Sequence, residues 1–250
     1  FNIDSANYFD QRAITLARQI KFPKGEVQSL RYLAFAYRFS GNTPKALEIH
    51  FKTLKLAKLN NLKREEANIL NQIGTIYSEE HDYAKAFYFL KESSKLCEAI
   101  HYSTMLGLNQ NVLGRTYGRM NQLDSALYYC LLASKNLNKD IPELFTINSR
   151  DIGLIYSKKG DKKRALAYFK NSLKLMKPDQ GYETWSQSNY QIALVYQQNK
   201  QLDSSIYFAN VALDYAQRGN FYSRIIEASR LLSKLYESKD VVKALQYSNM

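Results

Sequence analysis

Half of the arginines in this 250-residue chain occupy related positions, and their chemistry is that of carboxylate binding. Six of the twelve arginines lie three residues before, or one, four or five residues after, small residues that recur about every 40 positions. These offsets place side chains on one face of a helix. A guanidinium donates two parallel hydrogen bonds to a carboxylate, which an ammonium group cannot do. The six arginines are Arg31, Arg38, Arg115, Arg119, Arg150 and Arg230.

Amide and tyrosine side chains occupy corresponding outward positions on the expected first helices of the second, third and fifth repeats. They are Asn68, Asn71, Asn111 and Tyr190. Amides hydrogen-bond both the N–H and the C=O groups of a peptide backbone. We therefore predict a groove that binds an extended or helical peptide with acidic groups. An alternative stays open, in which the arginines pair with glutamates on neighbouring helices instead.

The residues that enzymes and metal sites use are scattered in this chain. His50, His81 and His101 stand alone, and the sequence has no glycine-rich phosphate loop, HExxH, GxSxG or paired-aspartate pattern. Cys97 and Cys130 lie far apart without a CxxC motif, so we interpret them as small packing residues. We therefore expect no enzyme activity, no cofactor and no metal site in this segment.

The elements that position these side chains repeat along the chain. A small residue is followed three positions later by tyrosine six times, at intervals of 40, 40, 39, 40 and 40 residues. A fixed period of this length predicts a solenoid of stacked units, which presents a surface for binding. The pairs are Ala34/Tyr37, Gly74/Tyr77, Gly114/Tyr117, Gly153/Tyr156, Ala193/Tyr196 and Ser233/Tyr236.

Each unit is predicted to consist of two antiparallel helices joined by a tight turn. Around Gly153 and Tyr156, apolar residues follow the spacing of three and four that marks a helix. Gly160 suits the left-handed end of this helix, and Asp161 suits the N-cap of the next. A small residue on each helix, Gly153 on the first and Ala165 on the second, lets the two approach closely. The residues equivalent to Ala165 are Ala46, Ala86 and Ala126.

This pattern resembles the tetratricopeptide repeat. The residues that carry the resemblance in one repeat are Gly153, Tyr156, Gly160, Ala165, Phe169 and Ser172. Five full copies extend it over nearly the whole chain. The resemblance implies an all-α fold, a right-handed superhelical solenoid of antiparallel helix pairs whose first helices line the concave side. The period of about 40 residues exceeds the usual 34, and Ser205 and Ser233 stand where alanine or glycine is expected.

The repeats predict one domain over residues 1–250, without a linker. Residues 1–22 are predicted to be a second helix that lacks its first, and residues 225–250 a partial repeat. Because both ends then fall inside repeats, we expect the segment to come from a longer protein. The full repeats are predicted at 27–65, 66–105, 106–145, 146–184 and 185–224.

Composition and charge narrow the class of partner. The chain is 45% hydrophobic and carries a net charge of +12, and it has no stretch of about 18 apolar residues that would span a membrane. Such a charge favours acidic partners, nucleic acid or an anionic membrane surface. We expect a protein or peptide partner. Nucleic acid is the less favoured alternative, because the repeated tyrosines fit helix packing better than base stacking.

The sequence also resembles the long repeat arrays of bacterial regulators, especially membrane-tethered sensor kinases and transcription regulators. The turns Gln122–Ala126 and Gln201–Ser205 are similar to theirs. The resemblance implies the sensory or regulatory input region of a larger signalling protein, on the periplasmic side, with a membrane tether outside this segment. A cytoplasmic adaptor or peptide-sensing regulator is the alternative, and homodimer formation is left open.

Overall fold

Over the part that the structure describes, the chain folds into helices alone. This computed structural model describes residues 3–137, 141–174, 176 and 181–250, and these residues form thirteen α-helices and no strand. The predicted all-α fold of successive helix pairs is confirmed. Contacts between the helices divide the chain into two compact units.

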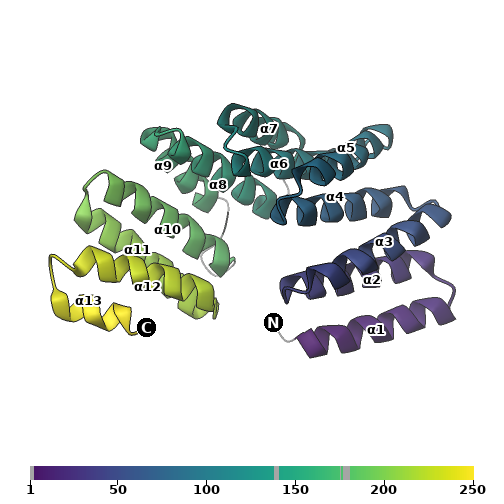
Figure 1. The fold of residues 1–250 in the computed structure, drawn as a ribbon, viewed down its shortest axis with the longest axis horizontal. Coiled ribbons are helices and arrows are strands. Elements are labelled where there is room, and N and C mark those ends of the chain that lie inside the picture. The colour runs from purple at the N-terminus through teal and green to yellow at the C-terminus, as the bar shows by residue number, and fades with distance from the viewer. Residues whose placement is uncertain (1–2, 138–140, 175, 177–180) are drawn as a thin grey trace. The chain divides into compact units, whose positions relative to one another are not determined.

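Unit 1 comprises the described residues up to Met120 together with Lys135–Leu137. Its helices follow one another as antiparallel neighbours, each packed against the next (Figure 1). The helix α1 packs on α2. The bounds are α1 Ile3–Gln19, α2 Pro23–Phe39, α3 Thr43–Leu59, α4 Lys63–Glu79, α5 Tyr83–Ala99 and α6 Ser103–Arg119.

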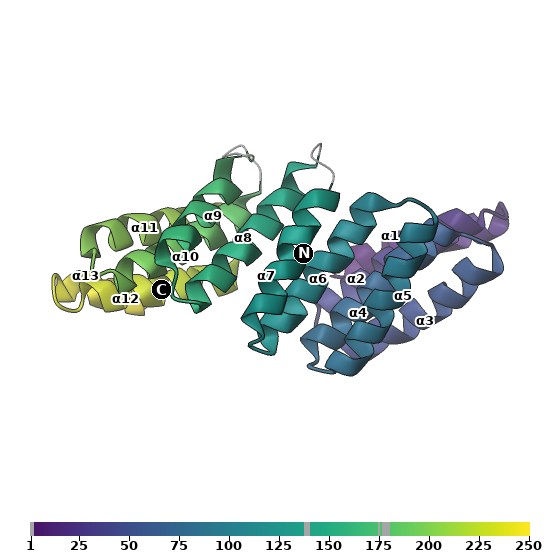
Figure 2. The ribbon, with the colours of Figure 1, turned by 90° about the horizontal axis from the view of Figure 1, so that it is seen from above.

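Unit 2 comprises Asn121–Ser134 and the described residues from Ile141 onward. From α8 to α13 each helix again packs on the next, and two perpendicular views agree that α10, α11 and α12 lie side by side (Figures 1 and 2). The bounds are α7 Leu123–Asn136, α8 Pro142–Lys158, α9 Lys162–Lys174, α10 Tyr182–Gln198, α11 Leu202–Arg218, α12 Tyr222–Tyr236 and α13 Val241–Ser248.

Most of the short turns between helices in the described ranges contain a residue in the left-handed conformation. The backbone φ is +79° at Gly160 and +53° at Asn61. After Gly160 the chain turns back, and the N–H of Asp161 donates to the carbonyl of Tyr156 at 2.9 Å. The Asp161 carboxylate then caps α9 by accepting from the Arg164 N–H at 2.9 Å. The roles predicted for Gly160 and Asp161 are confirmed.

The small residue of each repeat lies where its two helices come closest. A Cβ atom on Gly153 would lie 2.7 Å from the Phe169 ring, and one on Gly74 would lie 2.7 Å from Leu90 Cγ. Both distances are shorter than real contacts, so these positions need glycine at the present helix separation. The facing alanines predicted on the second helices are all fully buried. They are Ala46, Ala86, Ala126 and Ala165.

At least four of the six repeated tyrosines stack on aromatic rings of the second helix of their own repeat. Tyr77 stacks on Phe89 with ring centroids 5.6 Å apart and planes 7° apart. Tyr196 stacks on Phe208 in the same way, at 5.4 Å and 12°. Lys85 Nζ also lies over the Tyr77 ring, 5.0 Å from its centroid. The packing role predicted for these tyrosines is confirmed.

The first helices begin three or four residues before the predicted repeat boundaries. These starts are hard to recognise in the sequence, because most of the N-cap residues are apolar, such as Leu62, Tyr102 and Ile141. Their side chains make no capping hydrogen bond. A polar cap is the sequence signal that would have marked the helix start. The observed first residues are Pro23, Lys63, Ser103, Pro142, Tyr182 and Tyr222.

Buried polar side chains connect successive repeats within each unit. In unit 1, Asn109 is fully buried and donates to Ser93 Oγ at 2.9 Å, while Ser93 donates to the Ala67 carbonyl at 2.8 Å. In unit 2, the equivalent Asn148 donates to the Cys130 carbonyl at 3.0 Å. Because a buried polar group is costly without its partner, these bonds favour one register of stacking over others.

Replacing Gly153 by alanine is expected to destabilise the protein, although alanine is the better helix former by about 1 kcal/mol. The added methyl group would press on the Phe169 ring, and overpacking of this kind costs about 1–3 kcal/mol. Thermal unfolding followed by circular dichroism measures the net effect. In a Phe169→Leu background the Gly153→Ala penalty should shrink, and a higher melting temperature for Gly153→Ala alone would contradict the close-contact explanation.

Candidate functional site

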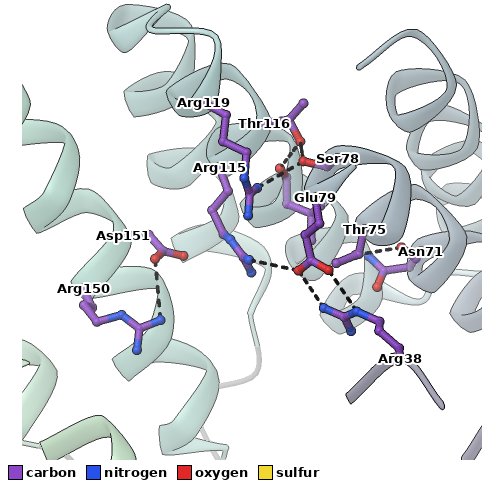
Figure 3. Close-up of polar contacts among 11 residues, drawn as sticks. Arg38, Asn71, Thr75, Ser78, Glu79, Arg115, Thr116, Arg119, Arg150 and Asp151 are labelled. Atoms are coloured by element: carbon purple, nitrogen blue, oxygen red, sulfur yellow. Dashed lines mark hydrogen bonds and ion pairs between the residues drawn. The ribbon is translucent and has the colours of Figure 1, made fainter. Parts of the chain in front are cut away.

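In unit 1 the first helices of successive repeats form a continuous row. The helix α2 contacts α4, and α4 contacts α6. Side chains from the three helices converge at the ends of α2 and α4, where Arg38, Glu79 and Arg115 point toward one another (Figure 3). We call the surface of α2, α4 and α6 that carries these three residues the even-helix face of unit 1.

A single carboxylate joins the two arginines of this cluster. Arg38 donates from Nε to one Glu79 oxygen at 2.9 Å and from Nη2 to the other at 2.6 Å, which is the bidentate geometry of a strong ion pair. Arg115 Nη2 lies 3.8 Å from the second of these oxygens. The side chains of Arg38, Glu79 and Arg115 are 27%, 32% and 32% exposed, so solvent reaches all three. We call this arrangement the Arg38–Glu79–Arg115 bridge.

Arg119 extends the positive charge along α6. Its Nη1 donates to Ser78 Oγ at 3.1 Å, and Ser78 Oγ is also 2.7 Å from Thr116 Oγ1 (Figure 3). Ser78 and Thr116 are fully buried, whereas Arg119 is exposed. The two arginines of α6 therefore lie one turn apart beside α4, with Glu79 as the acidic member of the group.

The predicted amides are less accessible than the arginines. Asn71 donates to Asn109 Oδ1 at 2.8 Å, and Asn111 is only 4% exposed. Asn68 is half-buried, and its Oδ1 has no hydrogen-bond partner within the described residues. The expectation that all three amides face outward is therefore corrected for Asn111, whose side chain packs inside the helix layer.

The three predicted site residues of unit 2 do not form one cluster. Arg150 donates to Gln187 Oε1. It also lies 3.8 Å from Asp151 (Figure 3). Tyr190 is half-buried, and burial with the nearby Glu227 raises the pKa of its hydroxyl group, which Arg224 opposes. Arg230 is exposed.

Arg31, the remaining predicted residue, lies on α2 with its guanidinium 5.5 Å from the Tyr32 ring centroid. Arg31 and Arg38 also act on His50, which is 1% exposed in the core of α3. Burial lowers the pKa of His50 to about 4, and the positive charges of Arg38 and Arg31 contribute in the same direction. Its Nδ1 has no hydrogen-bond partner within the described chain.

The structure thus favours, for some arginines, the alternative left open by the sequence. Arg38 and Arg115 pair with Glu79 of the neighbouring first helix, whereas Arg150 lies beside Asp151 of its own helix. Glu79, which joins two of these arginines, was not among the predicted site residues. The signal that could have identified it is its offset, since Glu79 lies five residues after Gly74, as Arg119 lies five residues after Gly114.

Other kinds of site leave no trace in the described residues. No group of three or more His, Cys, Asp or Glu side chains within them is placed to hold a metal ion. None of the helices in these ranges combines the length and apolar character needed to cross a bilayer. Cys97 and Cys130 are buried free thiols, as expected, and burial raises the pKa of Cys97 to about 11.

Comparison with protein families agrees with this fold. A tetratricopeptide-repeat family model matches residues 151–176, which include Gly153, Tyr156, Gly160 and Ala165. A search of curated proteins finds no match. The class that fold and repeat define is therefore a solenoid of helix pairs of the tetratricopeptide type.

Solved structures share the fold at low sequence identity. The chain is similar to BtubC from P. vanneervenii, with a TM-score of 0.68 at 17% identity over 87% of this chain and 91% of that one. It is similar to PH0952 from Pyrococcus horikoshii, a signal transduction ATPase with a tetratricopeptide repeat sensor, with a TM-score of 0.73 at 19% identity. That match covers 97% of this chain but only 39% of the ATPase.

A third similar structure contains a bound peptide. NprR in complex with its cognate peptide NprX matches with a TM-score of 0.67 at 18% identity, over 99% of this chain and 75% of that one. The peptide-free quorum sensor NprR from B. thuringiensis matches with a TM-score of 0.68 at 16% identity. The TM-scores of these matches establish the fold of the present chain. Because the sequence identities are low, its ligand has to be argued from its own residues.

The buried His50 should make the protein less stable in mild acid. Its pKa is about 4 when folded and about 6.5 when unfolded, so only the unfolded chain takes up a proton as the pH falls below about 6.5. Each pH unit then costs at most about 1.4 kcal/mol of unfolding free energy, until the folded pKa is reached.

Urea unfolding at pH 7 and at pH 4.5 measures this loss. His50→Leu should reduce it, since Leu90 fills the equivalent position of the next repeat. The control is His101→Asn, because His101 is exposed and Asn tolerates its left-handed backbone. An equal acid loss in His50→Leu and in the control would refute the assignment.

Proposed function

We propose that this chain is a non-enzymatic scaffold that binds a protein or peptide, and that it serves as the sensory or regulatory input region of a larger bacterial signalling protein. The observation that carries the proposal is the Arg38–Glu79–Arg115 bridge. Two guanidiniums share one carboxylate on a surface open to solvent, with a third arginine, Arg119, beside them. The guanidiniums of such a surface offer more N–H donors than one carboxylate can use, so the surface can bind a further carboxylate.

The chemistry of the even-helix face suits an acidic partner. Its arginines are half-exposed, so an incoming carboxylate displaces only part of their hydration and gains charge-assisted hydrogen bonds. Asn68 adds a half-buried amide on α4, the helix that carries Glu79. Arginine forks together with amides are groups that fix a peptide in one orientation.

A cytoplasmic adaptor or peptide-sensing regulator is the second candidate. What favours it is the similarity of fold to NprR, a quorum sensor that was solved with its peptide. Both candidates use the same face and differ in location and output. The first places the array on the periplasmic side of a membrane-anchored regulator, and the second places it in the cytoplasm.

Location separates the two candidates. If the array is periplasmic, protease added to spheroplasts of the native cell should digest it while a cytoplasmic marker stays intact. The full protein should then carry an apolar stretch of about 20 residues next to a kinase or helix-turn-helix region. Protection of the array from protease in intact spheroplasts would favour the cytoplasmic candidate.

Reversing the charge of both arginines on α6 should abolish binding of an acidic peptide. The probe is a fluorescein-labelled heptapeptide with alternating glutamate and alanine, and the readout is fluorescence anisotropy at 0.15 M salt, where distant charges are screened beyond about 8 Å. For Arg115→Glu with Arg119→Glu we expect at least about a tenfold loss of affinity, because two attractive contacts become repulsive.

The matched control makes the same change of charge elsewhere in unit 1. Lys55 on α3 and Lys91 on α5 are exposed, so Lys55→Glu with Lys91→Glu alters the net charge equally without touching the even-helix face. The control should retain affinity within about twofold. Undiminished binding by the arginine variant, or an equal loss in the control, would show that the peptide binds elsewhere.

A further inference from the structure

We infer that Arg115 is the residue that receives the ligand's carboxylate and that Glu79 is an internal competitor for it. This inference rests on the proposed function and adds two roles that differ in sign: Arg115 promotes binding and Glu79 opposes it. The ligand class is a peptide that offers a carboxylate, either from an Asp or Glu side chain or from its C-terminus.

The two arginines of the bridge are held very differently by Glu79. Arg38 makes two hydrogen bonds to the carboxylate, at 2.9 and 2.6 Å, which use one side of its guanidinium fork. Arg115 lies 3.8 Å away, beyond hydrogen-bond distance, and makes no hydrogen bond to any described residue. The Arg115 guanidinium can therefore bind a ligand carboxylate without breaking the bidentate pair between Arg38 and Glu79.

Arg115 is also placed so that a ligand can reach it. Its side chain is 32% exposed, and it projects from α6 toward α4 on the even-helix face (Figure 3). A half-buried guanidinium has already lost part of its hydration on folding, so a ligand carboxylate replaces little water there. Arg119, one turn further along α6, adds a second positive charge on the approach path.

Glu79 opposes the same ligand in two ways. Its negative charge repels a carboxylate that approaches Arg115, because both would lie within a few ångströms in a partly desolvated setting. Its charge also neutralises part of the positive electrostatic potential around Arg115. A ligand carboxylate must therefore out-compete Glu79 for Arg115.

The geometry of the bridge gives a test with opposite signs for the two residues. Glu79→Gln keeps the size of the side chain and removes its charge, so the acidic heptapeptide should bind about five- to twentyfold more tightly. Arg115→Gln should weaken binding. In the double variant the gain from Glu79→Gln should fall below about twofold, because the arginine that it released is gone.

Arg38 provides the matched control. The same cycle with Arg38→Gln should leave most of the gain from Glu79→Gln in place, since Arg38 is not the receiving residue. A heptapeptide with glutamine in place of glutamate and an amidated C-terminus has no carboxylate, so it should show no gain in any variant. Comparing free with amidated C-termini tells whether the carboxylate comes from the side chains or the terminus, and circular dichroism confirms that each variant is folded.

The outcomes separate this inference from the proposed function. If the acidic heptapeptide binds the unchanged chain but Glu79→Gln gives no gain, or gives the same gain without Arg115, the competitor role is wrong while the scaffold stands. If the gain disappears with Arg38→Gln instead, the receiving residue is Arg38 and the assignment to Arg115 fails. If the acidic heptapeptide binds no variant, whether its C-terminus is free or amidated, the proposed acidic partner is wrong as well.

Discussion

The close approach of the two helices of each repeat is the constraint on which the rest of this structure depends. At Gly74 and Gly153 there is no room for a Cβ atom, because Leu90 and Phe169 occupy that space on the facing helix. The absence of a side chain lets the helices approach, and the stacked rings one turn further, such as Tyr77 on Phe89, fix their rotation. One side of each first helix is thereby committed to packing.

This commitment leaves the opposite side of the first helices free to carry charge. Repeats that stack in one register bring residues about 40 positions apart into contact, so Arg38 meets Glu79 and Arg119 meets Ser78. The register itself is supported from inside, where Asn109 and Ser93 connect adjacent repeats. The surface cluster is thus a consequence of buried hydrogen bonds and helix packing, which bring the side chains of adjacent repeats within hydrogen-bond distance of one another.

The sequence predicted the parts of this structure that depend on local chemistry. The period of the small residues and the turn at Gly160 and Asp161 follow from neighbouring residues, and all were found as expected. The repeat boundaries were displaced because caps such as Leu62 carry no polar signal. Whether residues 1–250 form one array stays a prediction, since the two units are each defined by their own contacts.

The site was less predictable than the fold, because its contacts depend on how repeats stack. The pairing of Glu79 with Arg38 depends on the distance between two first helices, which no local pattern encodes. The burial of Asn111 has the same origin: its offset from Gly114 matches that of outward residues, yet it is 4% exposed. The rotational position of a residue on its own helix therefore does not predict its exposure unless the position of the neighbouring helix is also known.

The energetics of the bridge explain how a structural ion pair and a binding site can share the same residues. Ion pairs that remain about a third exposed contribute only about 0–1 kcal/mol to folding, far less than the packing of the helix core. The fold therefore does not need Glu79 at Arg115. When an external carboxylate takes the place of Glu79 there, it forms an ion pair of the same kind as the one it displaces, and the bidentate pair between Glu79 and Arg38 is kept. An exchange of this kind changes the surface without unfolding a repeat, which is the property that a binding face on a stacked-helix scaffold requires.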